Sequence, residues 1–154
     1  MKKLCVATLV VLLALGVSAR AEIPTLEVSD LTGSAVNLQS YIGVKPLILA
    51  FAASWSKSCQ EEIRSLQEIY EENRSSVEVL AVFFDKKPRD LAAFMAKNEI
   101  TFPVLLDKKL TALDRFQILI LPTTFCVNRQ GTIEKVFVDY DENVKKAIEA
   151  WLKS

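Results

Sequence analysis

The sequence predicts an α/β domain in which helices flank a central mixed β-sheet, with a β-hairpin extension at the N-terminal end. Two continuous apolar runs of strand length, residues 46–53 and 77–84, are typical of strands buried on both faces. A helical pattern follows each run, and this alternation predicts parallel strands joined by right-handed crossovers. A turn at residues 128–131 joins two later strands, which adds antiparallel pairing to the sheet.

The first half of the domain contains a hairpin, a buried strand and a long helix. Residues 23–28 and 36–38 are expected to pair over a turn at 30–33, and the strand at 46–53 follows. The helix at 58–73 carries an apolar stripe at helical spacing, and Ser58 with Glu61 three residues on fits a capping box. The stripe consists of Ile63, Leu66, Ile69 and Tyr70.

The second half continues the alternation without an internal repeat, a low-complexity tract or a linker. The expected elements are a strand at 77–84, a helix at 88–98, an extended segment at 102–106, a short helix at 108–116, strands at 123–127 and 132–138, and an amphipathic helix at 141–153.

Residues 1–21 have the pattern of a cleaved signal peptide. A basic start precedes an uncharged apolar run of 14 residues, and Ala-Arg-Ala at 19–21 has small residues where a signal peptidase reads. The run is shorter than the ~20 residues of a membrane span, so an uncleaved anchor is the less favoured alternative. We expect cleavage before Glu22, or else after Ala19. Residues 22–154 would then be an exported domain with no membrane attachment, periplasmic in a Gram-negative bacterium and secreted otherwise.

Composition excludes several functions. Loss of the three basic residues of the leader leaves 16 basic and 19 acidic residues, a net charge of −3, and no basic cluster indicates a nucleic-acid partner. The chain has no histidine, which excludes hydrolases with a histidine base and histidine-ligated metals or haem. Cys59 and Cys126, which remain after cleavage, do not make a metal site, so no metal and no cofactor is expected.

Residues 51–66 are the most informative stretch, because a buried strand there runs into Trp55 and then into Ser-Lys-Ser-Cys at the mouth of a helix. The unpaired N–H groups and positive dipole end of a helix N-terminus favour a thiolate over a thiol, and Lys57 adds a positive charge. Further along, Pro122 opens a buried strand, where proline is best tolerated at the first strand position or in a tight cis turn.

These features together resemble the TlpA/ResA group of exported thiol–disulfide oxidoreductases, in the thioredoxin superfamily and close to the AhpC/TSA redoxin proteins. Residues 50–59 resemble the family's strand, Trp-Cys-X-X-Cys motif and helix start, Glu62 matches its acidic residue, and residues 121–125 resemble its cis-proline loop. The resemblance covers nearly all of residues 23–153 and implies a thioredoxin fold acting on protein thiols or disulfides in the exported compartment. The implied substrate-binding residues are Trp55, Lys57, Leu121, Pro122 and Thr123.

The chain departs from the family pattern at its most reactive position. The family's first cysteine, an exposed nucleophile, is Ser56, whose hydroxyl cannot form a disulfide and is a poor nucleophile without a base. The surviving Cys59 corresponds to the buried resolving thiol, so the chain alone cannot run a two-cysteine shuttle. Arg64 stands where the family often has proline, and Leu121 replaces a small or β-branched residue.

The candidate catalytic residues are Cys59, Ser56 and Glu62, and each has a structural alternative. Cys59 is either a functional thiol or a buried structural one. Ser56 is either a helix cap or a hydrogen-bond donor to the Cys59 thiolate. Glu62 is either a proton acceptor with a pKa raised by burial or a solvated first-turn glutamate. Cys126 is expected in the core, too deep in its strand to bond Cys59.

These residues are compatible with two functions, a redox enzyme and a non-catalytic binding module. The first, narrowly favoured by the family pattern, is mixed-disulfide exchange or peroxide scavenging at an accessible, acidic Cys59, with a partner thiol as resolving group. Ala52 stands where a peroxiredoxin has proline, which counts against a full peroxiredoxin. The second is a non-catalytic module that docks an extended peptide beside Trp55, Ser56 and residues 121–122. A third interpretation, an altered copy of a Cys-X-X-Cys parent, stays open, and the oligomeric state is not indicated.

Overall fold

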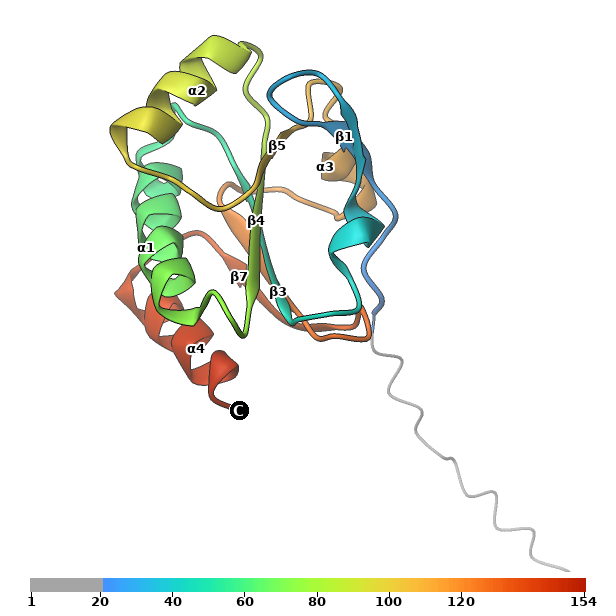
Figure 1. Cartoon of the computed structure of the whole chain (residues 1–154), viewed down its shortest axis with the longest axis vertical. Helices are drawn as coiled ribbons and strands as arrows, with labels where there is room; N and C mark the ends of the chain where they lie inside the picture. The colour runs from blue at the N-terminus through green and yellow to red at the C-terminus, as the bar shows by residue number, and fades with distance from the viewer. Residues whose placement is uncertain (1–20) are drawn as a thin grey trace, which may run out of the picture.

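The computed structural model describes residues 21–154, which form a seven-stranded sheet with helices on both faces (Figure 1). The strand order is β2-β1-β5-β4-β3-β6-β7. The strands are β1 (Glu27–Ser29), β2 (Ala35–Asn37), β3 (Leu47–Ala52), β4 (Glu78–Phe83), β5 (Val104–Leu106), β6 (Thr123–Val127) and β7 (Ile133–Val138). The helices are the 3-10 helix η1 (Leu38–Tyr41) and the α-helices α1 (Lys57–Asn73), α2 (Pro88–Lys97), α3 (Thr111–Arg115) and α4 (Glu142–Leu152).

The sheet is mixed, as the sequence predicts. β3, β4 and β5 run parallel, whereas β6 is antiparallel to β3 and β7 is antiparallel to β6. β1 joins the other side of the sheet through one antiparallel pair, Ser29 with Leu106, and carries β2 as the hairpin extension. Every residue of β3 is buried, which explains why the run at 46–53 is apolar without alternation.

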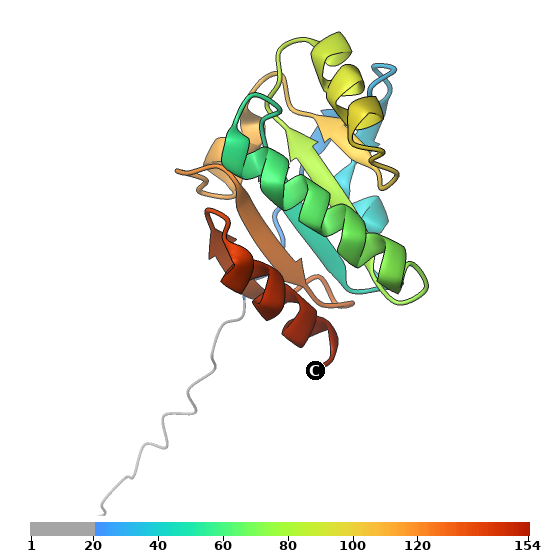
Figure 2. The same ribbon diagram turned by 90° about the vertical axis from the view of Figure 1, so that its left-hand side faces the viewer.

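Two separate hydrophobic cores lie on the two faces of the sheet. α1, α2 and α4 cover one face, where Ile63, Leu91 and Ile148 pack against the central strands, and Figure 2 shows α1 and α4 lying across the strands on this side. α3, η1 and the segment before β1 cover the other face, where Phe51 and Phe116 pack together. This three-layer arrangement confirms the predicted thioredoxin-type α/β fold.

The structure corrects several predicted boundaries. α1 begins at Lys57 and is capped by Ser56, so the predicted capping box of Ser58 with Glu61 is wrong. β1 is shorter than residues 23–28, and Pro24 in the segment before it has no N–H to give to a ladder. α3 begins later than residue 108 because Leu110 has a left-handed backbone, with a φ of 59°.

The predicted signal peptide lies outside the described residues, apart from Ala21. Ala21 accepts a hydrogen bond from the Ile133 N–H at 2.8 Å, and Glu22 forms an isolated bridge with Thr132. Across residues 21–154, we find no helix with the length and apolar character that a membrane span needs.

Candidate functional site

The site lies beyond the carboxyl end of β3, where the chain turns into α1. Ser56 caps this helix: its backbone is extended, and its Oγ accepts a hydrogen bond from the Cys59 N–H at 3.4 Å. The turn before it is fixed by Asp85 at the end of β4, whose carboxylate accepts from the Ser54 N–H at 2.9 Å and from the Ser54 hydroxyl. Ser56 is therefore a helix cap, and its hydroxyl also lies within hydrogen-bonding reach of the Cys59 sulfur.

The Cys59 side chain is fully buried, in the first turn of α1. Burial raises the pKa of Cys59 above its ordinary value, although hydrogen bonds to Ser56 and to the Ala53 backbone act in the opposite direction. The charges of Glu62 and Asp85 raise this pKa further. The local environment of Cys59 thus favours the neutral thiol over the reactive thiolate.

Lys57 does not supply the activation that its position in the sequence suggests. Its side chain is 90% exposed and pairs with Glu61 at 3.8 Å, on the solvent side of the first turn of α1. A charge so well solvated interacts weakly with a buried thiol. Lys57 therefore belongs to the outer surface beside the site.

Glu62 is buried on the sheet side of α1, so the solvated alternative is excluded by the structure. Its Oε1 accepts a hydrogen bond from Thr124 Oγ1 at 2.8 Å, whereas Oε2 has no hydrogen-bond partner among the described residues. Burial raises the pKa of Glu62 to about 8, with a smaller contribution from the charge of Asp139 and an opposing one from Thr124. Near neutral pH, Glu62 is mainly an uncharged carboxylic acid.

The second wall of the site is the loop that enters β6, and its Leu121–Pro122 peptide bond is cis, as predicted. Thr123 closes the loop by donating from Oγ1 to the Ile120 carbonyl at 2.7 Å. The Pro122 carbonyl accepts from the Asp139 N–H at 2.8 Å, and Asp139 in turn accepts from the Ser58 hydroxyl at 2.6 Å. These bonds connect the cis-proline loop to the first turn of α1.

A groove of about 630 Å³ opens beside this loop. Trp55 and Leu121, two of the predicted substrate-binding residues, line it, and the Trp55 side chain is 75% exposed. Phe84, Leu110 and Leu113 also line it, and we did not predict these three from the sequence. They follow the carboxyl ends of β4 and β5, so the common edge of parallel strands was the sequence signal that could have indicated them.

Cys126 lies apart from this site. It is buried in β6 opposite Ile48 of β3, and burial raises the pKa of its thiol to about 12. Cys59 and Cys126 are both free, in agreement with the expectation that Cys126 belongs to the core. Within residues 21–154, no cluster of histidine, cysteine or acidic side chains could hold a metal ion.

Comparison with known families identifies the chain. The AhpC/TSA family matches residues 19–136. The chain belongs to the AhpC/TSA family. Among curated relatives of this AhpC/TSA protein, thioredoxin-like protein YneN of Bacillus subtilis is 29% identical over 126 residues, covering 80% of this chain and 73% of YneN. The thiol-disulfide oxidoreductase ResA of Geobacillus thermodenitrificans is 29% identical over 130 residues, covering 82% of this chain and 74% of ResA.

Solved structures give the same relationship at the level of the fold. A putative thiol:disulfide interchange protein DsbE from Chlorobium tepidum superposes with a TM-score of 0.79 at 25% identity, covering 86% of this chain and 93% of that one. StoA from Bacillus subtilis superposes with a TM-score of 0.65 at 25% identity, covering 80% of this chain and 96% of StoA. The fold is that of the thioredoxin-like thiol–disulfide oxidoreductases.

Proposed function

We propose that this AhpC/TSA protein is an exported docking protein, which binds an extended segment of a partner protein in the groove beside the cis-proline loop and does not itself start thiol–disulfide exchange. The observation that supports this proposal is that the site lacks an accessible thiol but keeps an open groove. The exposed thiol position of the family is Ser56, and the remaining thiol of Cys59 is fully buried with a raised pKa. The groove lined by Trp55 and Leu121 is nevertheless open.

The relatives support a protein segment as the occupant. ResA is a thiol-disulfide oxidoreductase, and the putative DsbE is named as a thiol:disulfide interchange protein, so related proteins act on thiols and disulfides. An extended segment fits the groove because its walls come from four separate segments, which follow β3, β4 and β5 and precede β6, and they leave the groove open to solvent. Export is part of the proposal and is supported by the signal-like pattern of residues 1–21.

A second candidate is single-thiol exchange at Cys59. It is favoured by the position of Cys59 in the first turn of α1 and by the hydrogen bond between the Ser56 side chain and the thiol, which lowers the thiol pKa against the effect of burial. In this reaction the Cys59 thiolate would attack a disulfide of a partner protein, form a mixed disulfide and release one partner thiolate. A thiol of a second partner would then reduce the mixed disulfide.

Peptide binding to matched variants separates the two candidates. Residues 22–154 are titrated with short synthetic peptides of diverse sequence, each made with a central cysteine and again with serine in its place, and binding is followed by calorimetry. Docking predicts that Cys59→Ala binds like the unchanged protein and that Trp55→Ala binds more weakly. Val44→Ala is the matched control, since Val44 is 80% exposed and precedes the opposite end of β3.

The result that overturns docking is equally specific. If binding requires both the peptide cysteine and Cys59, and mass spectrometry finds a mixed disulfide on Cys59 after incubation with a disulfide-bonded peptide, exchange is the function. A disulfide reagent gives the complementary readout. Docking predicts that Cys59 reacts slowly in the folded protein and quickly only after unfolding, because a buried thiol is inaccessible.

A further inference from the structure

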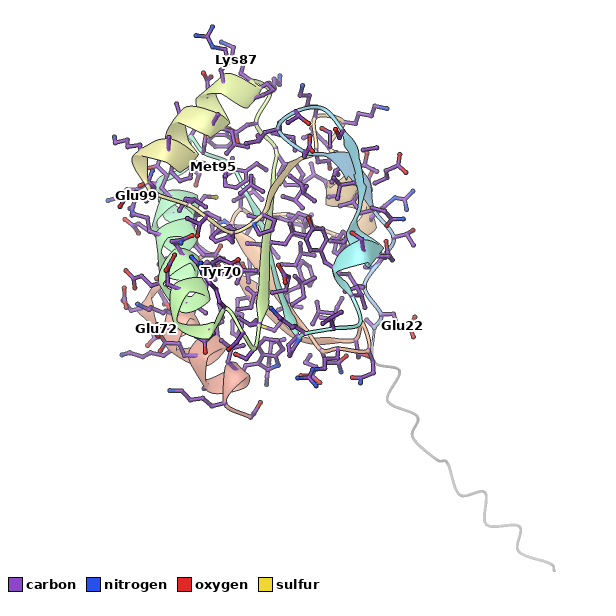
Figure 3. The ribbon with its side chains drawn as sticks, viewed as in Figure 1. Glu22, Tyr70, Glu72, Lys87, Met95 and Glu99 are labelled. Carbon is purple, nitrogen blue, oxygen red and sulfur yellow. The ribbon has the colours of Figure 1, made fainter. Side chains whose placement is uncertain are left out.

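β7 is an edge strand of the sheet, and most of its length is uncovered. It is the last strand in the strand order and pairs on one side only, with β6. The start of the domain covers its first end, where Glu22 bridges Thr132 and the Ile133 N–H bonds to Ala21. Figure 3 shows Glu22 where the described chain begins, at the opposite end of the molecule from Lys87. Among the described residues, no segment pairs with the rest of this edge.

The backbone of the uncovered edge is arranged to pair with another strand. The bulge of the β6–β7 pair lies at the first end of β7, so residues 135–138 keep a regular ladder. Just beyond this ladder, the Asp139 N–H donates to the Pro122 carbonyl beside β6. Alternate residues of an antiparallel strand turn their backbone groups to the same side, so Val136 and Val138 turn theirs away from β6. Proteins usually cover such outward groups, because they are a template for another strand.

An apolar surface without charge lies beside the same edge. The side chains of Val136 and Val138 line a hollow of about 340 Å³ together with Leu119 and Ile120. All four are exposed, and Leu119 is 94% exposed. The rest of the lining is also uncharged and consists of Phe116, Gln117, Thr123 and Phe125. A contiguous exposed apolar surface of this kind indicates a site of protein association.

The two ends of the edge carry opposite charges. Lys135, at the first end, has no ion pair among the described residues, and the neighbouring Glu134 accepts from Trp151 Nε1 at 2.8 Å. Asp139, just past the other end, also lacks an ion pair in this part of the chain. Its bonds to the Ser58 hydroxyl and to the backbone use only Oδ1. A strand that runs antiparallel to β7 with the same sequence would therefore present an acid to Lys135 and a lysine to Asp139.

We infer that two copies of this chain associate edge to edge through β7, antiparallel and around a two-fold axis at Phe137. Val136 of each copy would exchange backbone hydrogen bonds with Val138 of the other, and Lys135 would lie opposite Asp139. An axis at Lys135 would instead oppose two lysines, and like charges directly opposite are destabilising. Charge complementarity thus favours a second copy in this register. The two uncharged hollows would adjoin on one face of a continuous sheet.

The inferred interface lies outside the groove, and it does not depend on the proposed docking function. It does reach the loop that lines the groove, because Leu119 and Ile120 directly precede the cis Leu121–Pro122 bond. Asp139 also bonds both to this loop and to α1. Since the two copies of β7 run antiparallel, the two grooves would lie at opposite ends of the dimer.

Sedimentation equilibrium of residues 22–154 measures the association directly. A monomer–dimer equilibrium is expected, and Val138→Lys should weaken it by roughly tenfold or more, because the variant buries a charge in an uncharged surface. Val44→Lys is the matched control, since Val44 is an exposed valine in the loop before β3 and its change adds the same charge. In dilute solution, below the dissociation constant, the chain is monomeric, and the exposed side chains of β7 contribute little to the stability measured there.

A charge exchange tests the register. Lys135→Asp and Asp139→Lys are each expected to weaken the dimer roughly three- to tenfold, because each variant places like charges opposite one another. The double variant exchanges the two charges and is expected to restore the affinity. A purely structural effect of either change would not be restored, so a double variant as weak as the single ones would overturn the register.

Cysteine cross-linking gives an independent readout. In the inferred register, residue 136 of one copy lies opposite residue 138 of the other, within the ~7 Å between Cα atoms that a disulfide allows. A mixture of the Val136→Cys and Val138→Cys variants should therefore form a disulfide-linked dimer faster than either variant alone. The native thiols of Cys59 and Cys126 are buried and do not compete. If Val136→Cys alone cross-links as fast as the mixture, the axis lies at Val136, and the register is overturned.

Two further results would overturn the inference as a whole. One is a chain that stays monomeric at every concentration up to about 1 mM, which would leave the edge to another protein or to the residues before Ala21. The other is a dimer that survives Val138→Lys and dissociates in Trp55→Lys, because the copies would then associate through the groove.

Discussion

Thr124 of β6 donates a hydrogen bond from its hydroxyl to Oε1 of Glu62 on α1, across 2.8 Å in the interior between helix and sheet. Both side chains are buried, and the second carboxyl oxygen of Glu62 has no partner in the described part of the chain. This single bond is less than an ionised carboxylate needs in such surroundings, so the carboxyl group keeps its proton near neutral pH.

The pH dependence of stability follows from the raised pKa of Glu62. The unfolded glutamate titrates near 4.5 and the folded one near 8, so the folded state binds more protons between these values. The stabilisation is complete below pH 4.5 and is lost as the pH rises towards 8, by up to about 1.4 kcal/mol per pH unit. Urea denaturation measured across this range is expected to show the decline.

Glu62→Gln is the variant that checks this assignment. Glutamine keeps the shape and the hydrogen-bonding capacity of the neutral acid but does not titrate, so its free energy of unfolding is expected to vary much less between pH 4.5 and 8. If the variant and the unchanged protein show the same decline over this range, another group is responsible and Glu62 is ionised in the folded protein.

Thr124→Val removes the donor and leaves Oε1 of Glu62 unpaired. An unsatisfied buried polar group costs about 1–3 kcal/mol of the free energy of unfolding, which chemical denaturation at pH 6 can measure. Because the Thr124 bond lowers the pKa of Glu62, its loss is expected to raise that pKa further and to extend the pH-dependent decline to a higher pH. Thr124→Ser retains the hydroxyl and is expected to keep the upper pH limit of the decline. A Val variant as stable as the Ser variant would show that the bond contributes nothing.

The burial of Glu62 illustrates what the sequence could and could not decide. Glu62 lies three residues after Cys59 and four before Leu66, so it falls on the helix stripe that faces the sheet. This spacing alone predicts that Glu62 is buried. A glutamate in the first turn of a helix is, however, equally well explained by the helix dipole. Only the position of Thr124, contributed by a strand far along the chain, decides between the two.

The central sheet was predictable for a simple reason. β3 and β4 are buried along almost their whole length, and such strands must be apolar at every position, which produces the two continuous runs. The groove was less predictable because Phe84, Leu110 and Leu113 are adjacent only through the register of parallel strands. The helix η1 was missed as well, since a 3-10 helix of four residues has no periodic pattern.

Phe51 is the side chain on which the second core depends, and Phe51→Ala should be severely destabilising. It is fully buried, with ring centroids 4.7 Å from Phe116, 5.8 Å from Phe125 and 6.1 Å from Phe84. Truncation is expected to cost about 3–5 kcal/mol in urea denaturation. Val138→Ala is the control, because Val138 is 54% exposed and its loss should cost under about 0.5 kcal/mol. A small cost at Phe51 would mean that the aromatic cluster repacks around the gap.

Ser56→Cys is expected to permit thiol–disulfide exchange, because it would place a thiol at the N-terminus of α1, three residues before Cys59. The new thiol would replace the cap of α1, at a cost of about 1 kcal/mol in stability, and would lie at the helix N-terminus where a thiolate is favoured. It could attack a substrate disulfide, and Cys59 would then displace the substrate and close a disulfide within the protein. Reduction of a disulfide-bonded peptide in the presence of dithiothreitol is the measurement, and Ser56→Ala is the matched control for the lost cap.

The two results of this experiment have different meanings for the site. Activity in Ser56→Cys and not in Ser56→Ala would show that the missing thiol is what prevents turnover, and that the groove still presents partner sulfur atoms at the mouth of α1. Adding Cys59→Ala to the active variant should then trap the mixed disulfide, since no resolving thiol is left to displace the substrate. An inactive Ser56→Cys variant whose new thiol reacts normally with a small reagent would contradict this prediction, because access to the thiol would be intact while the groove failed to align a partner disulfide.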